Sequence, residues 1–276
     1  CQMTKYKNTK DKKYSNPFYS FRSSRILRTV RRGKVATMLK CNTSDNKVAE
    51  IFSLAQPDAI WLCMEHSSLN FVQAENQVNA AKIYDVDSIL RVSRGGYSDY
   101  IRGLEIDCAG LMIPQIKNLD DAKNVRDITK FPPLGKRGVD GGNNDGKYAK
   151  LAMNEYLELA NTERLIIYQI ENPSTLPDLE AIAEMEGVDA LFFGPGDYSL
   201  ALGVPGQINH PEIQRVRKLV ADVARKNNKI AGTPSSTSVA KDYINMGYNL
   251  LNLGADVLAL TNYAENLLET FHKINT

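Results

Sequence analysis

The stretches LIIYQIE at residues 165–171 and ALFFGPGD at residues 190–197 decide the fold. Each is a short apolar run with β-branched or aromatic residues, and an acidic residue, Glu171 or Asp197, follows each run. A helical segment separates the two runs, which is typical of neighbouring parallel strands that are buried on both faces. The carboxyl ends of such strands meet at one edge of the sheet, so the two carboxylates are predicted to lie close together.

The same alternation of apolar run and amphipathic segment extends along the chain. Strands are predicted at 35–39, 59–63, 88–92, 110–114, 165–170, 190–193, 229–232 and 249–253. Helices are predicted at 45–55, 70–82, 98–104, 118–128, 146–160, 174–185, 210–226 and 236–246, with a last helix at 256–271. Eight such units predict a closed (β/α)8 TIM barrel of parallel strands rather than an open sheet.

The N-terminal segment differs from the rest of the chain in its charge. Eleven of the 34 Lys and Arg residues fall within residues 1–34, which contain a single acid, Asp11. Residues 1–22 are therefore predicted to be a flexible basic leader, and residues 23–276 a single barrel domain. A short amphipathic helix at 23–32 is expected to cap the bottom of the barrel.

Composition also bounds the partners and the compartment. A net charge of only +2 over 276 residues gives no sign of a nucleic-acid partner. No apolar run reaches the length needed to span a membrane. Cys41, Cys63 and Cys108 lie in or beside predicted strands, so they are expected to be buried free thiols in a reducing, cytoplasmic compartment. The chain begins at Cys1, which leaves lipid anchoring through that residue as the alternative.

Polar residues gather where the predicted strands end. Glu65 and His66 follow the second strand, Arg91 is in the third, and Gln169 and Glu171 close the fifth. Each residue also has a purely structural interpretation: Arg91 pairing with Glu65, Glu171 as a charge at a helix N-terminus, and Asp197 as a turn residue. Placement of all of them at one rim favours an active site over these separate explanations.

The chemistry of this set suits a 2-oxo acid. Two carboxylates are the hard oxygen ligands that Mg²⁺ or Mn²⁺ prefers, and such a cation polarises a keto oxygen and a carboxylate. Arg91 would stabilise the developing oxyanion, and His66 would move a proton. Lys40 ends the first strand and leaves an imine mechanism open. The irregular segment 131–146, rich in Gly, Pro, Asn and Asp, is expected to be functional or mobile and to cover part of the barrel mouth.

With these residues in place, the sequence resembles the metal-dependent class II 2-oxo-acid aldolases of the HpcH/HpaI aldolase/citrate lyase family. The resemblance covers about residues 24–270. The stretches that carry it are EH at 65–66, LRV around Arg91, AGLMIP at 109–114, FPPLGKRG at 131–138, QIEN at 169–172, EGVDALFFGPGD at 186–197 and HPEI at 210–213.

The resemblance implies a TIM barrel, usually hexameric as a trimer of dimers, whose final helix is exchanged between subunits. It implies Glu171 and Asp197 as ligands of Mg²⁺, Mn²⁺ or Co²⁺, Arg91 as the group that holds a pyruvate-like moiety, and His66 as the base. Gln169, Gly196 and Pro234 would line the substrate site. The reaction implied is reversible aldol cleavage of a 4-hydroxy-2-oxo acid into pyruvate and an aldehyde.

Two residues depart from the family pattern. Cys63 stands three residues before His66, where the family typically has an Asp that orients the imidazole, and Glu105 replaces an Asp thought to reach the partner subunit's site. Because a thiol substitutes poorly for a carboxylate, the acid–base step is expected to differ. The segment 232–237 is shortened near the expected aldehyde site, so aldehyde specificity does not transfer. Two alternatives stay open: a CoA-thioester lyase of the citrate or malyl-CoA lyase branch, and a decayed homologue that only binds oxo acids.

Overall fold

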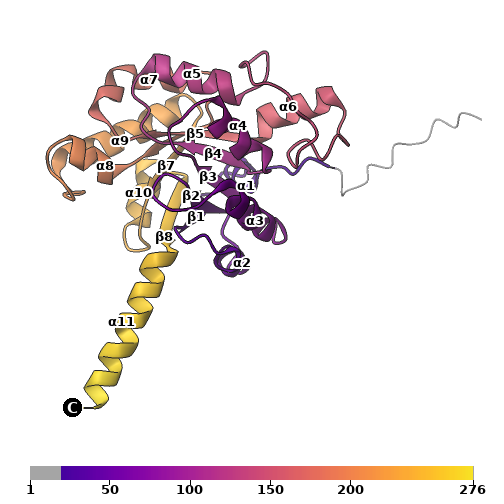
Figure 1. Ribbon diagram of the computed structural model, residues 1–276. Coiled ribbons are helices and arrows are strands. Elements are labelled where there is room, and N and C mark those ends of the chain that lie inside the picture. The colour runs from indigo at the N-terminus through magenta and orange to yellow at the C-terminus, as the bar shows by residue number, and fades with distance from the viewer. Residues whose placement is uncertain (1–19, 276) are drawn as a thin grey trace, which may run out of the picture.

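Eight parallel strands close into a barrel in the order β1 to β8, each paired with its sequence neighbours and β8 with β1 (Figure 1). The computed structural model describes residues 20–275, so the expectations for residues 1–19, including Cys1, lie outside it. The strands are β1 Ala36–Cys41, β2 Ala59–Cys63, β3 Asp87–Arg91, β4 Gly110–Ile113, β5 Leu165–Ile170, β6 Ala190–Phe193, β7 Ile230–Pro234 and β8 Leu250–Ala255. The predicted TIM barrel is confirmed.

Most helices follow the strands and form the outer layer, whereas α1 precedes β1 and α11 projects away from the barrel. They are α1 Arg25–Arg31, α2 Asn46–Leu54, α3 Phe71–Lys82, α4 Tyr97–Glu105, α5 Leu119–Thr129, α6 Met153–Glu163, the 3₁₀ helix η2 Pro173–Asp178, α7 Leu179–Glu184, α8 Pro195–Ala201, α9 Pro211–Lys226, α10 Ala240–Met246 and α11 Asp256–Ile274. Pro177 lacks the N–H of an ordinary helical residue and lies in η2, where a continuous helix 174–185 was predicted. The helix predicted at 146–160 begins only at Met153, because residues 147–149 adopt positive φ.

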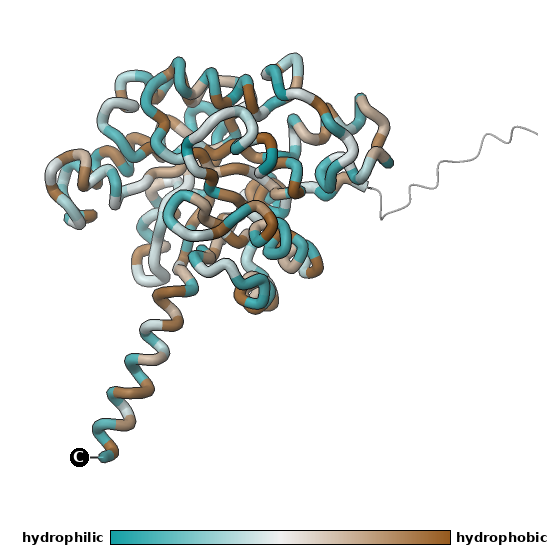
Figure 2. Tube along the Cα trace, viewed as in Figure 1, coloured by the Kyte–Doolittle hydropathy of each residue, from teal (hydrophilic) through white to brown (hydrophobic). Residues whose placement is uncertain are grey.

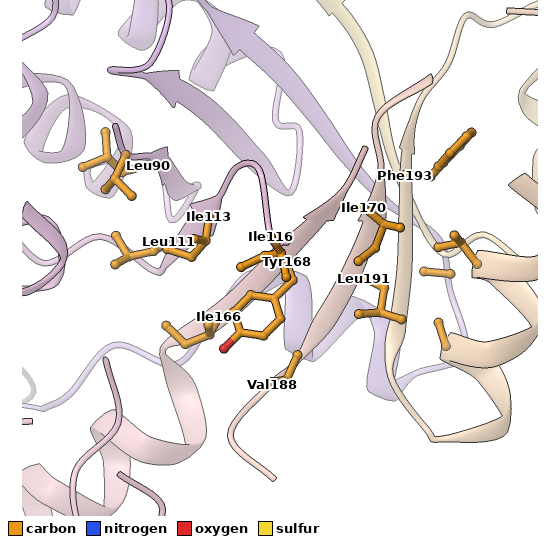
Figure 3. Packing of buried hydrophobic residues seen from close by; sticks show 14 of the residues in the cluster. Leu90, Leu111, Ile113, Ile116, Ile166, Tyr168, Ile170, Val188, Leu191 and Phe193 are labelled. Carbon is orange, nitrogen blue, oxygen red and sulfur yellow. The ribbon is translucent and has the colours of Figure 1, made fainter. Parts of the chain in front are cut away.

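Apolar side chains pack in two layers, one inside the barrel and one between the strands and the helices. Inside the barrel, residues such as Met38, Trp61 and Phe192 pack against one another, and Ile26 of α1 closes the cluster from the amino-terminal end. The outer layer joins the strands to the helices, and Figure 3 shows Tyr168, Leu191 and their neighbours within it. Cys41, Cys63 and Cys108 are free and buried, as predicted. Alternate residues of each strand serve the two layers, which explains the continuous apolar runs of the sequence.

The amino-terminal end of the barrel holds a network of buried charges. Arg22 and the Ser24 hydroxyl both donate to Asp87, at 2.8 and 2.7 Å, and fasten the chain before α1 to the start of β3. Residue 22, which was predicted to belong to a flexible leader, is therefore docked. Arg164, just before β5, pairs with both Asp107 and Asp145.

The segment 131–146 belongs to this amino-terminal end, which corrects the expectation that it covers the barrel mouth. Asp145 is fully buried there, and it accepts hydrogen bonds from Arg164 at 2.7 Å and from Tyr156 at 2.9 Å. Lys130, just ahead of the segment, donates to the carbonyl of Arg164 and to Asp189, which precedes β6. The segment is irregular because its polar side chains satisfy these buried partners.

Helix α11 projects away from the barrel as a free arm (Figure 1). Of its side chains only Asp256 is buried, and that carboxylate ties the arm to the β1–α2 connection by accepting from Asn42 and Thr43 N–H groups at 2.8 and 2.9 Å. Figure 2 shows apolar residues recurring along the arm. Among the residues that the structure describes, no helix has the length and apolar character needed to cross a membrane.

Candidate active site

A pocket of about 610 Å³ opens at the carboxyl ends of the strands and extends outward over β6 and β7. Six of the residues predicted for the site line it: Arg91, Gln169, Glu171, Gly196, Asp197 and Pro234. They come from β3, from the end of β5, from β7 and from helix α8 after β6, so the barrel brings together residues that are far apart in the sequence. The expected meeting of Glu171 and Asp197 in one pocket is observed.

Glu171 is the buried centre of this arrangement. Its side chain is 2% exposed, and its two oxygens accept hydrogen bonds from the Gln115 backbone N–H at 2.6 Å and from the Gln169 amide at 3.2 Å. Gly194 passes so close that a Cβ there would lie 2.8 Å from Glu171 Oε2. Burial raises the pKa of Glu171 to about 7, and the negative charge of Asp197 adds to the rise.

Asp197 reaches the pocket from a helix that the sequence parse missed. Helix α8 starts immediately after β6, with Gly194 as its N-cap and Pro195 at its first position, and it places Asp197 in its first turn. Proline at the first helical position loses no hydrogen bond, which is the signal that the GPGD motif contained. The short turn holds Asp197 beside the end of β5.

The two carboxylates fit a divalent cation. No Lys, Arg or His side chain within residues 20–275 forms an ion pair with Glu171 or Asp197. Arg91 is close enough to oppose the rise in the pKa of Glu171, but its own ion pair is with Glu65. Nor does the same region hold a group of three or more His, Cys, Asp or Glu side chains arranged around an ion. Glu171 and Asp197 would thus supply part of a coordination shell, and substrate and water oxygens would complete it, as hard cations require.

Arg91 is fixed by four neighbours. Its Nη2 donates to Cys63 Sγ at 3.0 Å, its Nη1 donates to Gln169 Oε1 at 3.5 Å, and its Nε lies 3.1 Å from Glu65 Oε2. The guanidinium carbon stands 4.8 Å from the centre of the Trp61 ring. Arg91, Gln169 and Glu171 therefore form one chain of hydrogen bonds along the pocket wall.

His66 is placed differently from the other predicted site residues. Its side chain is 59% exposed, and the imidazole is not part of the pocket lining. Its Nε2 lies 3.4 Å from Glu65 Oε2, whereas Cys63 Sγ meets only the backbone N–H of His66, at 3.4 Å. Cys63, where the resemblance implies an Asp that orients the imidazole, contacts the Arg91 side chain rather than that of His66.

Glu105 and Lys40 lie outside this pocket. Glu105 ends α4 at the amino-terminal side of β4, the end of the barrel opposite to the pocket. Lys40 Nζ stands 4.9 Å from the centre of the Trp61 ring, and burial lowers its pKa. Lys40 is thus a partly desolvated amine near the barrel mouth.

Several lining residues were missed from the sequence, namely Trp61, Ile208, Asn209, Arg217, Val239 and Tyr243. Arg217 carried a signal, because it falls four residues after Ile213 and four before Ala221 on the buried face of α9. A charged residue within an apolar helical stripe needs a polar partner once it is buried, which is the signal that the sequence contained.

The raised pKa of Glu171 makes the stability of the metal-free chain depend on pH. The native carboxyl keeps its proton up to about pH 7, while the unfolded chain loses it near 4.5. This contribution to stability is complete below pH 4.5 and is lost as the pH rises through 7. We expect the free energy of unfolding, measured by urea denaturation in EDTA from pH 5 to 8, to fall by at most about 3 kcal/mol through this one group.

Glu171→Gln is the matched control, because its amide stays neutral throughout. The difference in unfolding free energy between the variant and the parent chain should grow with pH in favour of the variant. A difference that is constant from pH 5 to 8 would contradict the raised pKa.

Comparisons with known proteins agree with this geometry. Residues 36–262 match the family model of the HpcH/HpaI aldolase/citrate lyase family. A "2-keto-3-deoxy-L-rhamnonate aldolase" of Salmonella paratyphi A is 28% identical over 249 residues, which cover 90% of this chain and 92% of the relative. One of the same name from Klebsiella pneumoniae is 28% identical and covers 93% of each chain.

Solved structures of proteins named for the same family superpose on this chain. An HpcH/HpaI aldolase from Desulfitobacterium hafniense superposes with a TM-score of 0.84 at 26% identity, covering 89% of this chain and 95% of that one. A family protein from Burkholderia cenocepacia gives 0.80 at 27% identity, with 87% and 95% covered. These findings confirm the predicted enzyme class, a lyase of carbon–carbon bonds. The chain belongs to the HpcH/HpaI aldolase/citrate lyase family.

Proposed function

We propose that this chain catalyses reversible aldol cleavage of a 4-hydroxy-2-oxo acid to pyruvate and an aldehyde, with a divalent cation of the Mg²⁺, Mn²⁺ or Co²⁺ class held by Glu171 and Asp197. The observation that carries the proposal is a pair of acids that form no ion pair within residues 20–275 and share a pocket with Arg91. When bound, the cation would draw electron density from the keto and carboxylate oxygens of the substrate.

The side chains then divide the chemistry. Cleavage breaks the C3–C4 bond, the C4 hydroxyl gives up its proton as the aldehyde forms, and the electron pair moves to the C2 oxygen, which leaves the enolate of pyruvate. Arg91 would donate a hydrogen bond to that oxygen, and its contacts with Gln169 and Glu65 hold it ready to do so. Protonation at C3 completes the release of pyruvate.

The residues around the proposed base are where the chain departs most from the family pattern that the resemblance implies. We infer that His66 accepts the hydroxyl proton, supported by its position three residues after β2 and its 3.4 Å contact with Glu65. Because its imidazole is largely exposed and is not in the pocket lining, the proton would pass through water. Glu65, which touches both His66 and Arg91, would orient them together.

The aldolase proposal predicts metal-dependent pyruvate release. A panel of 4-hydroxy-2-oxo acids, assayed with Mg²⁺, Mn²⁺ or Co²⁺ and with EDTA, should give turnover only with metal. Asp197→Ala should abolish it, and Arg91→Ala should lower kcat by on the order of a hundredfold, as loss of an oxyanion donor does. Asp222→Ala, at an exposed acid of α9 paired with Lys218, is the control and should change nothing.

Other outcomes of the same assay would contradict the proposal. Binding of oxamate without turnover of any substrate would indicate a decayed site. Cleavage that resists EDTA and is lost in Lys40→Met would indicate an imine mechanism, which the lowered pKa of Lys40 would assist.

Cys63 offers a gain-of-function test. An Asp at this position would place a carboxylate against Arg91 Nη2 and the backbone N–H of His66, the two groups that now contact the thiol. We expect Cys63→Asp to raise kcat for pyruvate release several-fold, because charged hydrogen bonds fix both catalytic groups better. Cys63→Asn has nearly the same shape without the charge and should give no gain. An unchanged or lower rate in Cys63→Asp refutes the idea that the thiol weakens the acid–base step.

We also infer that α11 docks on a second copy of this chain, which supports the homo-oligomer expected from the resemblance. Seven of its large apolar side chains are more than half exposed: Leu258, Leu260, Tyr263, Leu267, Leu268, Phe271 and Ile274. An apolar arm of this length is costly in water, and an identical arm on a partner offers a matching surface. Assembly into six subunits stays a prediction.

The oligomer prediction is tested by light scattering coupled to size-exclusion chromatography. The parent chain should elute at a multiple of 30.8 kDa. Leu267→Glu combined with Leu268→Glu should shift it to smaller species, since two buried charges would oppose the contact. Asn262→Glu on the polar side of α11 is the control and should keep the assembly. A parent chain that is monomeric at micromolar concentration contradicts the inference.

A further inference from the structure

Lys40 is an amine that points into the barrel and has no part in the cleavage step proposed above. It is in register with Trp61 of β2, whose side chain belongs to the inner apolar cluster, and it comes two residues after Met38 of the same cluster. Alternate residues of a strand share a face, so Lys40 faces the interior near the carboxyl end of β1. Within residues 20–275 its Nζ has no hydrogen bond or ion pair, and it rests 4.9 Å from the centre of the Trp61 ring.

The Trp61 ring connects Lys40 to the pocket. Trp61 is one of the lining residues, and the Arg91 guanidinium stands over the same ring. Asn252 of β8 faces the interior on the other side of β1, in register with Pro234 of the lining. Trp61 Nε1 and Asn252 Oδ1 are both buried without a hydrogen-bond partner in the part of the chain that the structure describes. A contact between an ammonium and a ring is weak beside a buried ion pair, so Nζ can leave Trp61 for a substrate at little cost.

The order of the strands places Lys40 across the barrel from the two acids. In a closed barrel of eight strands, β1 lies opposite β5, and β2 lies opposite β6. Glu171 follows β5 directly, and Asp197 belongs to α8 just after β6. An oxo acid that turns its C1 and C2 oxygens toward these acids turns C3 away from them, because the bonds of the trigonal C2 diverge. C3 then faces the side of the barrel mouth that β1 and β2 form.

We propose that Lys40 carries the proton to and from C3 of the pyruvate enolate, a step that the mechanism above leaves without a residue. The inference rests on the proposed function and deepens it. Once the C3–C4 bond has broken, the Lys40 ammonium gives a proton to C3, the electron pair of the C2–C3 double bond forms the new C–H bond, and the C2 oxygen regains its carbonyl. Lys40 is left as a neutral amine. The proton that it gives balances the hydroxyl proton taken by His66, and water restores both groups.

The other groups near this side of the mouth are less suited to the step. Cys63 is fully buried, and its thiol already accepts a hydrogen bond from Arg91 at 3.0 Å. His66 is largely exposed and is not part of the pocket lining. Arg91 keeps its proton at any working pH, so it stabilises the enolate oxygen without protonating a carbon. Lys40 combines an inward direction with a proton that it can both give and take.

The surroundings of Lys40 favour exchange of its proton near neutral pH. Burial lowers the pKa of Lys40, and the positive charge of Arg91 lowers it further. The groups that oppose this shift are Cys63, Glu65 and Asp256. The neutral amine is therefore populated at a lower pH than in an exposed lysine, which is the condition for an efficient acid–base group.

Exchange of the C3 hydrogens of pyruvate for deuterium, followed by NMR in heavy water with metal present, isolates this step because it needs no aldehyde. Lys40→Met keeps an apolar stem on Trp61 and should slow exchange by about a hundredfold, as loss of an acid–base group does. Lys40→Arg keeps the charge but cannot give up its proton, so it should be equally slow. Lys218→Met, at an exposed lysine paired with Asp222, is the control and should exchange like the parent chain.

The fluorescence of Trp61 gives a second readout that needs neither metal nor turnover. Trp61 is the single Trp of the sequence, so its emission reports the ring on which Lys40 rests. An ammonium beside an indole quenches the emission, so in the metal-free parent chain and in Lys218→Met it should rise as the pH passes the lowered pKa of Lys40. This rise should be absent from Lys40→Met and Lys40→Arg. The exchange rate of the parent chain should rise over the same pH range, since the neutral amine is the base.

Different failures have different meanings. Exchange at the parent's rate in Lys40→Met or Lys40→Arg would overturn the inference, and so would a parent emission that does not depend on Lys40. Exchange that persists in EDTA, with a pyruvate adduct fixed on Lys40 by borohydride, would indicate an imine and also overturn it. Metal-dependent cleavage without exchange would reject the inference alone. Metal-dependent exchange without cleavage of any 4-hydroxy-2-oxo acid would reject the proposed function alone, and absence of both would reject the two together.

Discussion

The pocket depends on a carboxylate that is held nearly out of water without a cation beside it. Glu171 receives two N–H hydrogen bonds, which fix its position but do not neutralise its charge. Asp197 adds a second negative charge nearby, and Arg91, the nearest candidate to balance them, already faces Glu65. Two acids without an ion pair therefore meet where the strand ends converge, which suits the divalent cation that we propose there.

The barrel keeps the two acids of the pocket apart from the charged residues that stabilise the fold. Asp107, Arg164 and Asp145 form buried ion pairs at the amino-terminal ends of the strands, and Lys82, Lys147 and Arg137 add to them. At the carboxyl ends, Glu171 and Asp197 form no such pair with residues 20–275. The same residue types thus stabilise one end and remain available for chemistry at the other, as is general for this fold. Closure of β1 against β8 fixes the distances that the pocket needs.

Strand positions were readable from the sequence because both faces of each strand are buried, which makes the apolar runs continuous. Gln169 and Glu171 were readable too, since alternate residues at the end of β5 face the pocket. For Arg217 the apolar stripe of α9 indicated burial, but its place in the pocket depends on the packing of α9 against β6 and β7, which no local pattern reveals. The prediction that segment 131–146 covers the barrel mouth was wrong for a related reason. Its polar residues bind buried partners that are distant in sequence, such as Arg164.

The two guanidinium groups of the pocket differ in how they are held, and this bears on what each contributes. Arg91 has Gln169, Cys63 and Glu65 around it before any substrate arrives, so its geometry costs little to reach and suits a group that must meet a developing charge. Arg217 has one hydroxyl and an aromatic face, and no carboxylate of the described residues pairs with it. Of the two, Arg91 is therefore the group suited to stabilise a transition state, because its orientation is set before the reaction begins.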